Sequence, residues 1–144
     1  MLEGLAPFHP RMVHFPIALS LVGALFAAAG LLRRDERWFG YGQLSLLLAG
    51  LSTLAAGITG LVDQARAPDD PVVAALINQH ITVAIALGVV TGLVLYWPLR
   101  YKRLFSGGQG RWGYLALLAL LVMLVFATGW LGGQLVYRFG VGVQ

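Results

Sequence analysis

Four long apolar runs limit what this chain can fold into. Each run is about 20 residues or longer, which is the length an α-helix needs to cross the hydrocarbon of a bilayer. Charged residues make up only 11% of the 144 residues, whereas a soluble domain has about 25%. We therefore expect an all-α integral membrane protein, a single four-helix up-down bundle over residues 1–144 with helices at about 11–32, 41–62, 72–97 and 112–137.

The loops between the runs predict the orientation of the bundle. Three basic residues lie on the side that carries both termini, whereas seven lie in the first and third loops: Arg33, Arg34, Arg37, Arg100, Lys102, Arg103 and Arg111. Basic loops usually stay in the cytoplasm. We therefore expect a multi-pass protein of the bacterial inner membrane, with both termini on the periplasmic or extracellular side. Because the basic residues flank apolar runs, nucleic acid is not an expected partner.

All three histidines fall on one side of this predicted threading. His9 and His14 stand at the head of the first run, and His80 lies early in the third run. Asp63 ends the second run on the same side. An ionisable residue at the edge of hydrocarbon is costly and needs a partner, so it indicates a functional site. We expect the first and third helices to be diagonal partners that hold a ligand between them.

A haem b with two histidine ligands is the first interpretation of this pattern. His14 and His80 are the expected axial pair, because each lies within an apolar run. His9 lies five residues before His14, about 140° away around a helix, so it is expected to be an accessory group or a ligand of a second site. Arg11 could pair with a haem propionate or anchor the helix at the interface.

Small residues follow His80 along one face of the third run. Ala84, Gly88 and Gly92 recur at four-residue steps below the histidine. Such a face either permits close helix packing or leaves room beside a cofactor. We expect this stripe to line the cofactor.

Two other interpretations remain open. One is a copper or zinc site built from imidazole and carboxylate ligands, which suit both ions; its ligands would be His9, His14, His80 and Asp63. The other is a non-redox accessory or assembly subunit whose histidines only pack. The chain has no cysteine, which excludes thiolate metal sites and c-type haem attachment.

Several segments resemble one bacterial family of small membrane proteins, domain of unknown function 2231. They are His9-Pro10, Val13 to Leu19, Gly60 to Asp63, His80, Gly129 to Tyr137 and Gly140 to Val143. The resemblance implies four helices with histidines at one membrane face. It also implies a redox setting, because members of the family are fused to cytochrome-c-like domains. This setting favours haem over the alternatives.

One position departs from the family pattern. Many members carry a histidine where Phe139 stands in this chain. Four histidines could serve two bis-histidine haems, but three cannot. The resemblance therefore implies one haem, a second haem with a single protein ligand, or a partly lost site.

Together these observations predict an electron carrier or subunit rather than a stand-alone catalyst. The expected partners are the lipid bilayer, a periplasmic redox partner or larger membrane complex, and the quinone pool.

Overall fold

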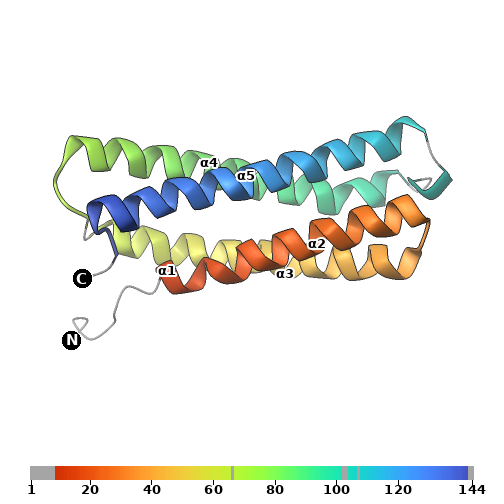
Figure 1. Cartoon of the computed structure of the whole chain (residues 1–144), viewed down its shortest axis with the longest axis horizontal. Helices are drawn as coiled ribbons and strands as arrows, with labels where there is room; N and C mark the ends of the chain where they lie inside the picture. The colour runs from red at the N-terminus through yellow and green to blue at the C-terminus, as the bar shows by residue number, and fades with distance from the viewer. Residues whose placement is uncertain (1–8, 66, 102–103, 107, 143–144) are drawn as a thin grey trace.

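Long antiparallel helices make up the described part of the chain (Figure 1). The computed structural model describes residues 9–65, 67–101, 104–106 and 108–142. These residues contain no strand, and the four long helices are all apolar enough to span a bilayer. This confirms the predicted all-α membrane bundle. The elements are α1 (His9–Met12), α2 (His14–Arg33), α3 (Glu36–Gln64), α4 (Pro71–Arg100), the 3-10 turn η1 (Leu104–Ser106) and α5 (Gln109–Phe139).

The first span is interrupted between α1 and α2 because of a proline. Pro16 has no N–H to donate to the carbonyl four residues earlier, so one helical hydrogen bond is missing there. Val13 nevertheless keeps helical backbone angles, and its N–H donates to the carbonyl of His9 at 3.1 Å. The two segments therefore form one span, and His9 lies inside it rather than in the lead-in predicted from the sequence.

Aspartate caps set where α3 and α4 begin. The carboxylate of Asp35 accepts hydrogen bonds from the backbone N–H groups of Arg37 and Trp38 at 2.9 and 3.3 Å. Asp70 caps α4 in the same way, and Pro71 occupies its first turn. Such caps satisfy N–H groups that a helix start leaves unpaired. The cap at Asp35 starts α3 at Glu36, five residues before the predicted start.

The end of α4 also differs from the prediction, which placed it at Trp97. The helix continues past Pro98 to Arg100. The indole Nε1 of Trp97 donates to the carbonyl of Gly110 on α5 at 3.0 Å. This bond fixes the end of α4 against α5 and offsets the hydrogen bond that Pro98 cannot make.

The four spans form two hairpins, α2–α3 and α4–α5 (Figure 1). Across the bundle, α2 packs beside α5 and α3 packs beside α4. The first and third spans are therefore diagonal, as the up-down threading predicts. The helices of the α2–α3 hairpin are far more closely packed than the two hairpins are with each other.

Glycines explain the close contact within the α2–α3 hairpin. A Cβ atom added to Gly30 would overlap the backbone of Phe39, and one added to Gly42 would overlap the backbone of Ala27. At Gly23 it would lie 2.7 Å from a side-chain carbon of Leu46. In lipid, small residues of this kind let helix backbones approach and gain dispersion contacts. This contact is the tightest feature of the bundle.

Two hydrogen bonds between polar groups join helices in the half of the bundle away from the histidines. The amide of Gln43 donates to the hydroxyl of Tyr114, which is fully buried. The hydroxyl of Ser45 donates to the carbonyl of Leu19 at 2.8 Å. Hydrocarbon offers no alternative partner, so these bonds hold α3 against α5 and α2.

Substitution of Gly42 by Ala should destabilise the protein by about 1–3 kcal/mol, the usual cost of overpacking. The added methyl group would collide with the backbone of Ala27, which cannot move without separating α2 from α3. Denaturant unfolding in detergent, followed by circular dichroism, measures the change.

Gly40→Ala is the matched control, because a Cβ at Gly40 meets no atom within 4 Å. It should be neutral or slightly stabilising, since alanine favours helix more than glycine does. Equal stability of the two variants would contradict the close contact.

Candidate functional site

One end of the bundle carries all three histidines. The starts of α1 and α4 meet the ends of α3 and α5 there, at the left of Figure 1. His9 opens α1, His14 opens α2, and His80 lies early in α4. We call this region the histidine end.

His9 is held against the last turns of α3 by three hydrogen bonds. Its ring Nδ1 lies 2.8 Å from the carbonyl oxygen of Ala56 and 3.3 Å from the hydroxyl of Thr59. Its backbone N–H donates to the carboxylate of Asp63 at 3.2 Å. Both the backbone and the ring of His9 are therefore fixed, and the ring is half-buried.

These bonds assign the tautomer of a neutral His9. A carbonyl oxygen can only accept a hydrogen bond, so the proton is assigned to Nδ1. The other ring nitrogen, Nε2, then keeps an unshared electron pair. Metal-binding histidines commonly donate their second ring N–H to a backbone carbonyl, which fixes the ring and strengthens the ligand. His9 has this arrangement with Ala56.

His80 lies across from His9 on α4 and is also half-buried. Its Nδ1 is shielded from solvent and has no hydrogen-bond partner among the described residues. The backbone of Thr128 lies beside the ring but forms no hydrogen bond with Nδ1 in this arrangement. A buried polar atom without a partner is costly, and in native proteins such an atom often marks a bound group.

The two imidazoles lie next to each other between the hairpins, in an edge-to-face arrangement. Their ring centroids are 6.3 Å apart and their planes are nearly perpendicular, at 86°. His9 belongs to the α2–α3 side, because it bonds to α3, and His80 belongs to the α4–α5 side. The pair therefore connects the two halves of the bundle.

A glycine lies beside each imidazole. A Cβ atom at Gly60 would lie 3.0 Å from Cε1 of His9, and one at Gly132 would lie 3.2 Å from Cε1 of His80. Each ring therefore occupies space that most other residues would fill. Gly60 on α3 and Gly132 on α5 form two sides of the site.

The structure pairs His80 with His9, whereas the sequence predicted a pair of His80 and His14. His14 is exposed at the start of α2, and so is Arg11 on α1. The physical reason is the separation of His9 and His14 around the helix axis, since only one of them can point toward α3 and α4. The two roles expected for Arg11, a propionate partner or an interfacial anchor, stay predictions.

Asp63 contributes to the site through the backbone of His9 rather than as a neighbour of both rings. Within the described residues, no three side chains of the types His, Cys, Asp and Glu are close enough to share one metal ion. What these residues do bring together at this end is the pair of imidazoles of His9 and His80.

Phe139 packs at the same end of the bundle. It lies against a hydrophobic cluster of Val73, Ile77 and Leu135. Ile77 and Val73 precede His80 on α4 by about one and two turns, respectively. The phenyl ring therefore closes the end of the α4–α5 hairpin with apolar contacts.

The small-residue stripe below His80 does not face the imidazole pair. Gly88 and Gly92 are exposed on the outside of α4, and a Cβ at either meets no atom within 4 Å. The residues that do surround the pair include Ala56 and Thr59, which the sequence analysis missed. Ala56 contributes its backbone carbonyl, and no side-chain pattern signals that role.

Nitrogen-15 NMR of histidine-labelled protein should show His9 as the neutral tautomer with its proton on Nδ1. The reason is the 2.8 Å contact with the carbonyl of Ala56. The spectrum of a His9→Ala variant assigns the signal. A proton found on Nε2 of His9 would overturn the assigned ligand orientation.

Comparison with known proteins gives one match. The family described as "Predicted membrane protein (DUF2231)" matches residues 5–144, which agrees with the resemblance noted in the sequence. Neither the curated proteins nor the solved structures include a match to the chain.

Proposed function

We propose that this chain, which belongs to the predicted membrane protein family DUF2231, transfers electrons in the bilayer through a haem b ligated by His9 and His80. The observation that carries the proposal is the approach of the two ring centroids to 6.3 Å between the hairpins. Two imidazoles bound on opposite sides of one metal, each with a metal–nitrogen distance of about 2.0 Å, have a centroid separation near this value. His9 takes the place that the sequence analysis gave to His14.

The environment of each ring supports a ligand role. The carbonyl of Ala56 holds the proton of His9 on Nδ1, which leaves Nε2 free to bind a metal. A buried histidine with a purely structural role usually has a hydrogen-bond partner for each shielded ring nitrogen. Nδ1 of His80 has none among the described residues, which supports a ligand role. The glycines at 60 and 132 leave space where a side chain would otherwise contact the rings.

A haem iron with two imidazole ligands supplies one-electron transfer without binding a substrate. The residues of the chain would hold this group in place. α3 fixes His9 through three hydrogen bonds, and α5 shields His80. Rigid ligands of this kind lower the structural rearrangement that accompanies a change in charge.

The arrangement of the rings also favours a second candidate, a copper ion. The imidazoles stand edge to face, and a single ion between them needs less rearrangement than a macrocycle does. Imidazole suits copper. Zinc is less well supported, because its protein sites use three or four ligand residues and the described residues bring two together.

The position of the site at one end of the bundle suggests how electrons would enter and leave. The pair lies near the rim that the positive-inside rule assigns to the periplasmic side. A periplasmic redox protein or a larger membrane complex could exchange electrons there, and quinone is the lipid-soluble alternative. A stand-alone catalytic role is not part of the proposal.

The purified protein should show a Soret band that shifts on reduction with dithionite, and His9→Ala or His80→Ala should abolish it. Each substitution would remove one of the two side chains that would hold the haem. Absorption spectra and total metal analysis of the same samples distinguish haem from copper.

His14→Ala is the matched control, because His14 is an exposed histidine at the same end. It should leave the spectrum unchanged. Loss of the band in His14→Ala but not in His9→Ala would contradict the assigned pair. Protein without chromophore or metal would support the non-redox accessory role instead.

A further inference from the structure

On α3, a glycine makes one backbone carbonyl available to His9. A helical side chain leans toward the N-terminus and covers the turn before its own Cα. Gly60 has no side chain, so it leaves uncovered the carbonyl of Ala56, four residues earlier. Nδ1 of His9 reaches this carbonyl at 2.8 Å, and Cε1 of the ring would lie 3.0 Å from a Cβ at Gly60. The ring therefore occupies the place of the missing side chain.

The helix α5 repeats this arrangement beside His80. Gly132 follows Thr128 by four residues, so it leaves the carbonyl of Thr128 uncovered in the same way. A Cβ at Gly132 would lie 3.2 Å from Cε1 of His80 and 3.7 Å from Nδ1, so this edge of the ring faces α5. The backbone of Thr128 lies beside the ring, while its hydroxyl donates to the carbonyl of Leu124 at 2.7 Å. The backbone carbonyl is thus the group that Thr128 presents to His80.

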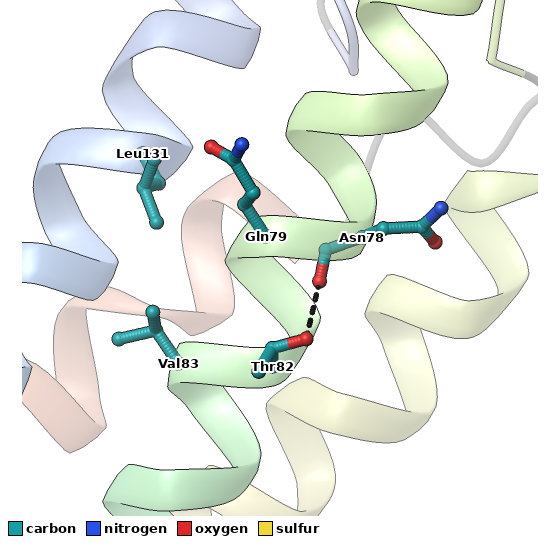
Figure 2. Close-up of a pocket in the computed structure, with 5 residues that line it drawn as sticks. All are labelled: Asn78, Gln79, Thr82, Val83 and Leu131. Carbon is teal, nitrogen blue, oxygen red and sulfur yellow. Dashed lines mark hydrogen bonds between the residues drawn. The ribbon is translucent and has the colours of Figure 1, made fainter.

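The contact between His80 and α5 lies on the inner side of the α4–α5 hairpin. A hollow of about 450 Å³ on the outer surface is lined by Gln79 and Leu131, among others (Figure 2). These two residues directly precede His80 and Gly132 in the sequence. Consecutive residues point about 100° apart around a helix, and neither His80 nor Gly132 lines this hollow. The ring of His80 instead lies toward the other hairpin, with its centroid 6.3 Å from that of His9.

The two hairpins therefore hold their histidines in equivalent ways. Both begin at the histidine end and cross the bundle in the same direction. In membrane proteins built from parallel repeats of this kind, binding sites lie at the interface between the repeats. The halves differ in one respect, because Nδ1 of His9 has its carbonyl partner whereas Nδ1 of His80 is buried without one among the described residues. The arrangement in the first hairpin predicts the carbonyl of Thr128 as the missing acceptor.

We propose that the backbone carbonyl of Thr128 accepts a hydrogen bond from Nδ1–H of His80, and that Gly132 positions the ring by leaving this carbonyl uncovered. A small turn of the ring closes the bond. Because a carbonyl oxygen can only accept, the proton of neutral His80 lies on Nδ1 and the unshared electron pair lies on Nε2. The consequence for ligation rests on the proposed function: each imidazole binds through Nε2 and donates its Nδ1–H to a backbone carbonyl, as metal-binding histidines commonly do.

Nitrogen-15 NMR of histidine-labelled protein without added haem or metal tests where the proton of His80 lies. His80 should be the neutral tautomer protonated on Nδ1, and the spectrum of His80→Ala identifies its signal. A proton on Nε2 of His80 would overturn the proposal. The measurement needs no bound group, so this tautomer in a protein that binds neither haem nor copper would contradict the proposed function and still support the hydrogen bond to Thr128.

Gly132→Ala tests the positioning role. The added methyl group would contact Cε1 of His80 and cover the carbonyl of Thr128, so the preference for the Nδ1 tautomer should be lost. The dissociation constant for added hemin should rise about tenfold, the usual effect of losing the partner of a metal-binding histidine.

Gly129→Ala is the matched control on α5, because a Cβ at Gly129 meets no atom within 4 Å. It should change neither the tautomer nor hemin binding, and circular dichroism in detergent checks that both variants keep the helical fold. Retention of the Nδ1 tautomer in Gly132→Ala, or equal loss of hemin binding in both variants, would overturn the role of Gly132. If Gly132→Ala does not fold, the spectrum of the unsubstituted protein still decides the tautomer of His80.

Discussion

The lack of water in hydrocarbon governs every polar group in this bundle. A group that cannot bond to solvent must bond to the protein, and the core meets this demand with pairs such as Gln43 with Tyr114 and Ser45 with Leu19. Against that background, the unpaired groups are informative. Nδ1 of His80 is one, and it lies beside a second imidazole. The Nε atom of Arg111, near the start of α5 and at the opposite end of the bundle, is the other buried side-chain nitrogen without a partner among the described residues.

The histidine pair depends on both hairpins, and each hairpin contributes in a different way. The α2–α3 side supplies a ring whose orientation is fixed by the carbonyl of Ala56. The α4–α5 side supplies a ring with an unsatisfied nitrogen and a glycine, Gly132, beside it. One imidazole is therefore oriented in advance, and the other has a bonding capacity that the described residues leave unused.

The fold could be predicted because it depends on the length of the apolar runs and of the connections between them, and both are read directly from the sequence. Run length predicts four spans, and the short connections predict antiparallel neighbours. The end at which the histidines gather follows from the same threading. The family match then confirms a membrane protein. Helix ends were less predictable, since the cap at Asp35 extends α3 and Pro98 does not end α4.

The partner of His80 could not be predicted, because it depends on how the first span is rotated about its axis. His9 and His14 both suit the role by position, and only the bonds to Ala56 and Thr59 distinguish them. One of these bonds uses the backbone carbonyl of Ala56. Every residue type has a backbone carbonyl, so the residue type at position 56 does not indicate the bond. The closest glycine contacts, at Gly30 and Gly42, likewise depend on where two helices cross. The sequence analysis had instead singled out the small residues that follow His80 on α4, of which Gly88 and Gly92 face outward.

The unequal packing of the two hairpins has a consequence for the site between them. Backbone contact locks α2 to α3, whereas the backbones of the two hairpins lie farther apart across the seam between His9 and His80. Hydrophobic mismatch is relieved by tilting helices, and tilt is absorbed where packing is weakest. We therefore expect the distance between the imidazoles to change with bilayer thickness, so that the surrounding lipid composition influences the geometry of the site.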